Sequence, residues 1–332
     1  MRTYAIRRFL LVIPTMLMLT VILFIVFRMI PGNVVEMMVM EQVYEQEEGT
    51  VYELNEEAIR HALGLDAPFY VQYFRWLGIV PKPDVGFDGV LQGNFGHSLY
   101  DNTTLLEMLR LKLPVTVELS LLSMVLGLLF SVPIGIYAAV RQDTMGDYLG
   151  RTWSIMALAI PYFWVATLIM IYPSIWWNWS PPVQYIPLVE DPLGNLGQFL
   201  IPALVMGMFT SGGTMRITRT MMLEVLRQDY IRTAWAKGLS ERVIIIRHAV
   251  RNTLIPVITV VGGMIPALFA GSVIMEQIFC LPGIGRYLLQ ACLARDYLIV
   301  SGHNLIFATF VMIMIVITDL AYAYVDPRIR YR

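Results

Sequence analysis

The sequence predicts an all-α integral membrane protein with six transmembrane helices. Hydrophobic residues make up 57% of the 332 residues and charged residues only 15%, and the mean hydropathy is +0.62. About a quarter of the residues of a typical soluble domain are charged. A bilayer core about 30 Å thick requires about 20 mostly apolar residues per helix. Six runs satisfy this requirement: Phe9–Ile30, Leu113–Val140, Trp153–Trp176, Leu196–Gly213, Pro256–Phe279 and Leu298–Val325.

The first apolar run is interpreted as a retained membrane span, and the basic residues set its orientation. Arg2, Arg7 and Arg8 precede it, but the run is longer than the core of a signal peptide and no small-x-small cleavage site follows it. The termini and the loops after the second and fourth spans carry sixteen Lys and Arg residues, whereas the other segments carry seven plus Arg28. Because Lys and Arg accumulate on the cytoplasmic side, both termini are predicted to be cytoplasmic.

Three regions follow from these spans. Residues 1–30 form an N-terminal cytoplasmic segment and the first transmembrane helix, and residues 31–112 form an extracytoplasmic loop region with an acidic insertion. Residues 113–332 form a transmembrane core of five helices, which contains a basic cytoplasmic loop at residues 216–256.

The outer loop region is acidic first and aromatic afterwards. The stretch from Asn33 to Glu57 contains eight glutamates and no basic residue, which indicates either a solvated insertion or a docking surface for an extracytoplasmic partner. Four aromatic residues follow it and are expected to act as anchors at the membrane interface: Tyr70, Tyr73, Phe74 and Trp76.

Motifs that bind nucleotide or support catalysis are missing from the sequence. A P-loop requires Gly-Lys followed by Ser or Thr, yet Lys82, Lys112 and Lys237 precede Pro, Leu and Gly. The four histidines lack the His-Glu-x-x-His spacing of zinc proteases. We therefore expect no enzyme and no bound cofactor or metal, and any energy from nucleotide must come from another subunit. Cys280 and Cys292 are expected to be free, although an oxidising compartment would allow a bridge.

Four residues of the spans are candidates for a translocation path. Glu276, near the outer end of the fifth span, is expected to line an outer vestibule, because a carboxylate inside a bilayer normally faces protein or a water-filled cavity. Asp319 is interpreted first as a structural residue and second as part of the path. Gly262 and Gly263 are interpreted as helix-packing residues, with the lining of a passage as the alternative. The chain of buried acidic or histidine residues that marks a proton-coupled carrier is missing.

The basic cytoplasmic loop is predicted to be a helix, a break and a second helix. The stretch "QDYIRTAWAKGLS" reads as a short helix that ends at Gly238, the residue type best able to adopt a left-handed conformation. Ser240 is then a suitable N-cap for the second helix. The next apolar residues, Ile244 to Ile246, require cover from the spans or from the first helix. Pro256 is expected at the start of the fifth span.

The first helix of this loop carries a pattern suited to contact with another protein. Its small residues Thr233, Ala234 and Ala236 are expected to form a surface that a partner can approach closely. Three basic residues are expected to make polar contacts at the rim of that surface: Arg232, Lys237 and Arg242.

This loop resembles the cytoplasmic signature of binding-protein-dependent ABC importer permeases, which reads Glu-Ala-Ala, three residues, Gly, and later a hydrophobic residue and Pro. Ala234 and Gly238 lie at the matching spacing, and "LIP" at Leu254–Pro256 supplies the ending. Arg232 and Thr233 replace the first Glu and Ala, and "RTAWAKGLSE" is similar to the variant of the dipeptide, oligopeptide and nickel branch. The stretches "LGLDAPFYVQYFRWL", "EQIFCLPGIGRYLLQACLARDYLIVSG" and "DLAYAYVDPRIRYR" extend the resemblance in family order.

The resemblance implies a type I ABC importer permease fold and a dipeptide permease B-type subunit in the cytoplasmic (inner) membrane. It also implies a second homologous permease subunit, two ATP-binding subunits that use ATP and Mg, and an extracytoplasmic solute-binding protein. Membrane lipid surrounds such a chain, and nucleic acid is no partner. The residues that would couple the chain to the ATPases are Arg232, Thr233, Ala234, Trp235, Ala236, Lys237, Gly238, Leu239 and Ser240.

Several functions remain open at this stage. An ATP-driven importer of dipeptides or oligopeptides is favoured, with nickel or another small solute of the same family as the alternative. An ion-coupled secondary transporter and a membrane receptor or scaffold without transport are weaker alternatives. The binding protein largely sets the specificity of such importers, so the solute is not named by this chain alone.

Overall fold

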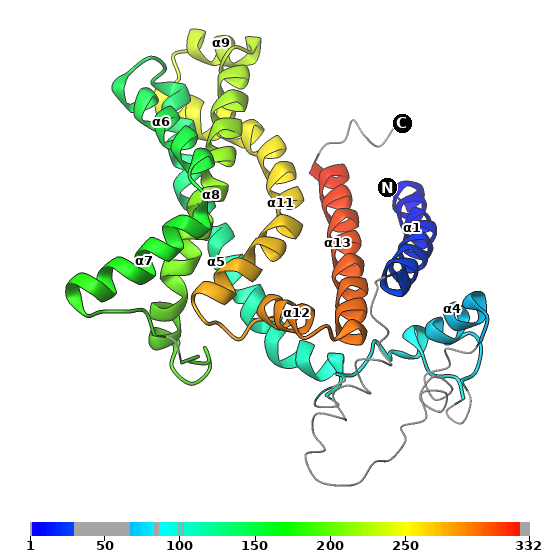
Figure 1. Cartoon of the computed structure of the whole chain (residues 1–332). Helices are drawn as coiled ribbons and strands as arrows, with labels where there is room; N and C mark the ends of the chain where they lie inside the picture. The colour runs from blue at the N-terminus through cyan, green and yellow to red at the C-terminus, as the bar shows by residue number, and fades with distance from the viewer. Residues whose placement is uncertain are drawn as a thin grey trace. The chain divides into compact units, whose positions relative to one another are not determined.

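The computed structural model of the chain describes residues 2–29, 67–82, 86–98, 100, 103–182 and 184–325. The acidic insertion Asn33–Glu57 and the basic C-terminal tail lie outside the described residues. Within the described part, the chain is helical, and its only β-type pairings are isolated bridges at Lys82–Gly86 and His97–Thr104. The all-α fold class predicted from composition is therefore confirmed (Figure 1).

The chain folds into two compact units. The larger unit consists of Met1–Ile6, Lys112–Tyr287 and Val311–Arg332, and the smaller unit consists of Arg7–Leu111 and Leu288–Phe310. The division of the chain at residues 30 and 112 is not tested by these units and stays a prediction.

Five described helices are long and apolar enough to cross a membrane, and six spans result if one bent pair of helices is counted as a span. This agrees with the six spans predicted from hydropathy. The five helices are α1 (Arg2–Met29), α5 (Leu105–Val140), α8 (Pro192–Leu226), the continuous helix Glu241–Ile278, and α13 (Tyr297–Val325).

The predicted span Trp153–Trp176 corresponds to a bent pair of helices rather than to one helix. These are α6 (Met145–Ala159) and α7 (Tyr162–Trp177), and they meet at an angle of 86°. Between them, Ile160 is extended, with φ −88° and ψ 121°. A residue before proline avoids the α-helical region, and Pro161 has no backbone N–H to continue the helix. A search for apolar runs does not detect such a break, because the residues on both sides of it are apolar.

The fourth span is longer than hydropathy predicts. Asp191 caps the N-terminus of α8 by accepting bonds from the backbone N–H groups of Leu193 (3.1 Å) and Gly194 (3.0 Å). The helix continues beyond the predicted end at Gly213 as far as Leu226. The first part of the loop predicted at residues 216–256 is therefore helix, and the next helix is α9 (Asp229–Ala236).

The second helix of the cytoplasmic loop and the fifth span form one helix. It comprises α10 (Glu241–Val243), a π-helical segment η2 (Ile244–Val250) and α11 (Arg251–Ile278). Pro256 consequently lies inside α11, so its predicted position at the start of a span is wrong. A continuous helix passes a displacement of its cytoplasmic end directly to its membrane part.

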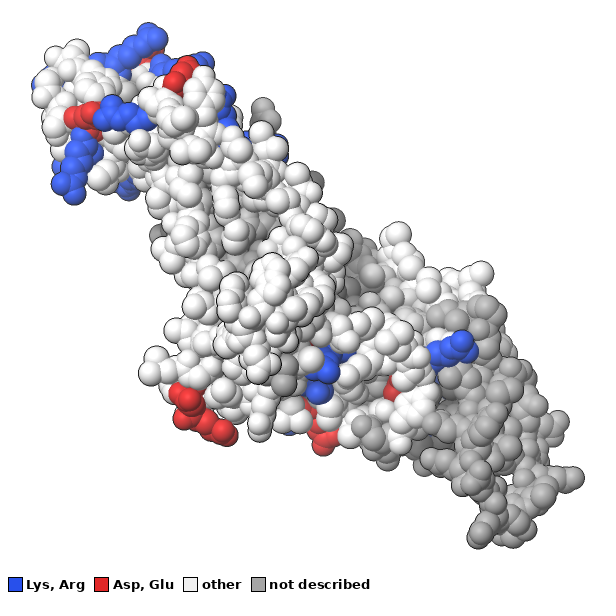
Figure 2. Space-filling view, turned by 60° about the vertical axis from the view of Figure 1, so that its left-hand side comes forward, with Lys and Arg blue, Asp and Glu red and all other residues white. Residues whose placement is uncertain are grey.

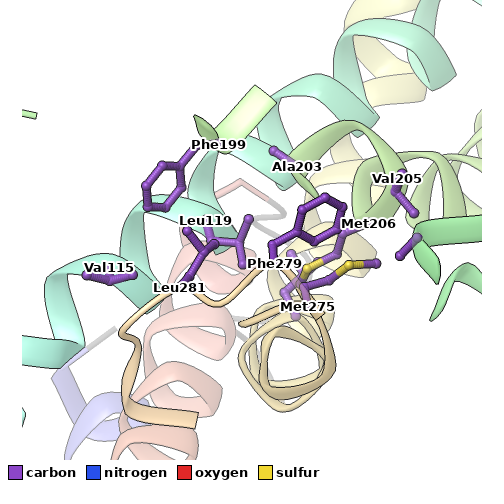
Figure 3. Packing of buried hydrophobic residues seen from close by; sticks show 11 residues of the cluster. Val115, Leu119, Phe199, Ala203, Val205, Met206, Met275, Phe279 and Leu281 are labelled. Atoms are coloured by element: carbon purple, nitrogen blue, oxygen red, sulfur yellow. The ribbon is translucent and has the colours of Figure 1, made fainter. Parts of the chain in front are cut away.

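The core of the larger unit lies between α5, α7, α8 and α11. Phe199 and Leu119 are fully buried there, together with Met275 and Leu281. Figure 3 shows these side chains pointing toward one another from α5, α8 and the end of α11. Between membrane helices, such close packing is stabilised by van der Waals contact, because lipid tails are as apolar as the side chains.

In the smaller unit, α4 (Phe69–Leu77) packs on α1. The ring of Phe24 lies 5.1 Å from that of Phe69 and 5.4 Å from that of Tyr73, whose hydroxyl shares a 2.9 Å hydrogen bond with Thr20. Tyr73 and Trp76 thus contact α1, whereas Tyr70, 65% exposed, remains suited to an interfacial position.

Two short helices complete the described elements. The 3-10 turn η1 (Val90–Gln92) follows Asp88, and α12 (Ile284–Leu293) follows α11.

Hydrogen bonds of 2.8 and 2.9 Å from Asn94 and an ion pair of 3.0 Å with Lys82 lower the pKa of Asp88.

Candidate functional site

The short helix α9 is attached to the larger unit through one apolar face. Ile231 is fully buried, and Ala234 is 7% exposed. They pack in a cluster with Met222 of α8, Ala139 of α5 and Ile244 of η2, which are also buried. In Figure 1, α9 lies at the end of the unit beyond α8. A helix held in this way moves together with the helices beneath it.

The predicted small-residue surface is wrong for Ala234. Thr233 and Ala236 are exposed as expected, but Ala234 points into the apolar cluster. Residues three apart share a helix face, and Ala234 follows the buried Ile231 by three positions. The spacing of these two residues was the signal in the sequence that could have shown this.

The rest of the surface of α9 and the turn after it are open. Trp235 is 49% exposed and Leu239 is 38% exposed, while Arg232 and Lys237 are exposed beside them. Among the described residues, Arg232 forms an ion pair with Asp229 alone, at 3.6 Å, and that pair is solvent-exposed. Figure 2 shows Lys and Arg side chains gathered over this end of the larger unit. An exposed tryptophan beside an arginine is typical of a protein interface, where both residue types are enriched.

Gly238 ends the helix as predicted. Its φ is +73°, in the left-handed region, and its N–H donates to the carbonyl of Trp235 at 2.9 Å. Ser240 occupies the predicted N-cap position, but its side chain makes no capping bond. Its backbone carbonyl instead accepts from Val243 (3.0 Å) and Ile244 (3.1 Å).

If the chain transports a solute, as the resemblance implies, Gly238→Val is expected to impair transport, whereas Gly238→Asn is expected to retain most of it. A Cβ at this position meets no atom within 4 Å, so the effect comes from backbone conformation alone. A left-handed conformation costs an L-residue about 1–2 kcal/mol, and asparagine tolerates it better than valine. We therefore expect the left-handed turn to be roughly five- to thirtyfold less populated in Gly238→Val than in the wild type. Uptake and ATP hydrolysis by the two variants check this, and equal activity of both would contradict it.

Contacts that the sequence did not reveal also hold α9. The side-chain amide of Asn252 donates to the hydroxyl of Tyr230 at 2.9 Å and so joins α9 to the first turn of α11. The apolar cover predicted for three isoleucines exists only in part. Ile244 is buried and Ile245 packs on the same cluster, but Ile246 is 57% exposed.

Glu276 is enclosed by helices in the structure, and a role of this residue in a translocation path stays a prediction. It is fully buried, and its carboxylate accepts bonds from the hydroxyls of Thr116 (2.6 Å) and Ser272 (3.0 Å) and from the backbone N–H of Arg286 (2.8 Å). Thr116 in turn accepts from the N–H of Ile284 at 3.0 Å. The carboxylate therefore joins α5 and α11 to the first turn of α12, where helix N–H groups lack helical partners.

The "LPGIGR" stretch makes room for this carboxylate. A Cβ at Gly283 would overlap the carboxylate of Glu276, and a Cβ at Gly285 would lie 3.0 Å from Oε2. The two glycines let the backbone come close enough for the bond from the N–H of Arg286.

The other candidates for the translocation path are placed separately. A Cβ at Gly262 would lie 2.9 Å from Cγ2 of Thr318, so α11 and α13 approach closely there, as the helix-packing interpretation predicted. Gly263 faces open space, with no atom within 4 Å of a Cβ position. Asp319 is half-buried on α13. A role of these residues in translocation stays a prediction.

An apolar cavity of about 180 Å³ lies in the larger unit beside the break between α6 and α7. Its lining includes Tyr162, Met206, Phe209, Met264 and Leu268.

The described residues hold no group of three or more His, Cys, Asp or Glu that could bind a metal ion, and the two cysteines are free.

Two family models match this chain. The model of the binding-protein-dependent transport system inner membrane component matches residues 131–331, and the model of the N-terminal part of such membrane components matches residues 1–120.

Curated relatives match over the whole chain. The oligopeptide transport system permease protein AppB of Bacillus subtilis is 35% identical over 334 residues, with all of both chains covered. The dipeptide transport system permease protein DppB of Escherichia coli is 32% identical over 360 residues, again with both chains covered. Among solved structures, an amino acid ABC transporter crystallised with histidines matches 67% of this chain and 94% of its own, with 12% identity and a TM-score of 0.48.

Proposed function

The chain belongs to the family of binding-protein-dependent transport system inner membrane components, and on that premise we propose that it is the permease subunit of an ATP-driven importer of peptides. It is a multi-pass protein of the cell membrane. The relatives named for oligopeptide and dipeptide transport, at 32–35% identity over their full lengths, support peptides as the solute.

The observation that supports this function most directly is the two-faced helix α9. Ile231 and Ala234 on one face are buried in the chain, whereas Trp235, Arg232 and Lys237 are exposed around the rest of the helix and its end. A helix attached on one side and open on the other is suited to seat in a groove of a partner. Because α9 is joined to α8 and to the helix that contains α11, movement of the partner would be passed to both spans as a rigid-body displacement.

The complete importer would contain more than this chain. We propose a heterodimer with a second homologous permease subunit, two ATP-binding subunits at the basic cytoplasmic end, and an extracytoplasmic solute-binding protein. The partner subunits would bind ATP and Mg, and this chain would bind neither. The distribution of Lys and Arg supports cytoplasmic termini and a cytoplasmic α9.

Reconstitution of the complete importer tests the proposal. Proteoliposomes would contain this chain, the second permease and both ATP-binding subunits, and the binding protein would be added outside with a labelled dipeptide or tetrapeptide. We expect peptide uptake that requires ATP and the binding protein and persists without an ion gradient.

Omission of ATP and dissipation of the proton gradient are the matched controls. Uptake that follows the proton gradient without ATP would overturn the proposal in favour of an ion-coupled carrier. Uptake of nickel ions with no uptake of peptide would overturn the choice of solute while leaving the ATP-driven importer in place.

A further inference from the structure

The turn between α5 and α6, Arg141–Thr144, is tied to both sides of α9. Arg141 pairs with Glu241 at the start of α10, directly after α9, at 3.2 Å. On the other side, the backbone N–H of Asp143 donates to the carboxylate of Asp147 at 3.1 Å, and this carboxylate binds α8 just before α9.

The tie to α8 is a buried ion pair. The Asp147 side chain is fully buried. The guanidinium of Arg219 donates two hydrogen bonds to its carboxylate, of 2.7 Å from Nε and 2.8 Å from Nη2. Arg151 adds a third cationic contact at 3.6 Å. A two-bonded arginine–carboxylate pair fixes orientation as well as distance. Arg219 lies about two turns before the end of α8, so the grip holds the segment that leads into α9.

The tie to α10 is of a different kind. The side chains of Arg141 and Glu241 are 53% and 43% exposed, so water screens their pair and it holds weakly. The turn is thus linked to the helix before α9 through Asp147 of α6, which that helix holds firmly, and it is linked more weakly through Arg141 to the helix after α9. Because the contact before α9 is firm and the contact after it is weak, α9 can shift while it stays connected to the turn.

We propose that the turn Arg141–Thr144 is a second transmission element of the importer, which carries the displacement of α9 to α5 and α6. Arg141, Asp147, Arg219 and Glu241 are its positioning residues. This inference rests on the proposed function, in which α9 receives the movement of the ATPases. Without these ties, α5 would follow α9 only through the apolar cluster that contains Ala139, and α6 only through its packing on α8.

Charge reversal at the exposed pair tests the inference in the reconstituted importer. Arg141→Glu and Glu241→Arg each place like charges opposite each other, and the double variant restores an attractive pair. We expect each single variant to raise the number of ATP molecules hydrolysed per peptide imported by about two- to fivefold, the range open to an exposed pair, and the double variant to return toward the wild-type ratio. Arg219→Lys keeps the charge but loses the two-bonded grip, and it should raise the ratio as well.

Glu190→Arg is the matched control. Glu190 is also an exposed glutamate, but it lies just before the N-terminus of α8, whereas Glu241 lies beyond the C-terminus of that helix. It should keep the wild-type ratio. Wild-type ratios in both single variants, or no recovery in the double variant, would overturn the transmission role. Lack of ATP-dependent uptake by the wild-type importer would instead overturn the proposed function.

Discussion

Ala234→Glu is expected to abolish ATP-coupled uptake, whereas Ala236→Glu is expected to reduce it only moderately. Both alanines belong to α9, but Ala234 is 7% exposed in the apolar cluster and Ala236 is exposed. A carboxylate at position 234 would be buried without a partner, which costs several kcal/mol, so α9 would detach instead. We expect uptake to fall more than tenfold, as measured in the reconstituted importer.

Limited trypsin digestion in detergent separates detachment of α9 from a lost contact with the ATPase. A detached helix exposes the peptide bonds after Arg232 and Lys237, so Ala234→Glu should be cleaved there faster than the wild type. Ala236→Glu is the matched control, because it adds the same charge to the exposed face and should keep the wild-type cleavage rate. Equal effects of the two variants on uptake, with unchanged cleavage in both, would show that Ala234 acts at the partner surface instead.

Glu276→Ala is expected to destabilise the protein strongly. It removes the acceptor of the Thr116 hydroxyl and of the Arg286 N–H and leaves both donors without this partner, whereas the Ser272 hydroxyl can still donate to the carbonyl of Phe269 at 2.7 Å. Each unsatisfied buried donor costs about 1–3 kcal/mol, so the loss from two donors should be about 2 kcal/mol or more. A lower melting temperature of the purified subunit in detergent is the measurement.

The exposed Glu190 provides the control for this change as well. Glu190→Ala removes a carboxylate of the same type and should leave the melting temperature within a degree or two. Glu276→Gln keeps one acceptor oxygen and should fall between Glu276→Ala and the wild type. Loss of peptide uptake in Glu276→Ala with an unchanged melting temperature would contradict the structural role and support the vestibule that the sequence suggested.

Local sequence signals predicted the features that depend on a few neighbouring residues. The apolar runs located the spans, because the length of a spanning helix is set by the thickness of the bilayer. Gly238 marked the end of α9, because glycine readily adopts the left-handed conformation found there. Pro161 carried a similar local signal for the break between α6 and α7, but hydropathy averages over such a residue, and the break was missed.

The sequence by itself determined the class of protein, the approximate spans, the basic cytoplasmic end and the place of α9, since composition and short motifs carry this information. Only the tertiary structure decided what covers the buried face of α9 and what Glu276 binds. Thr116 and Glu276 lie 160 residues apart in the chain, and Arg141 and Glu241 lie 100 apart. Contacts between such distant residues depend on how the helices pack, and packing is decided by the shapes of whole surfaces rather than by any one motif.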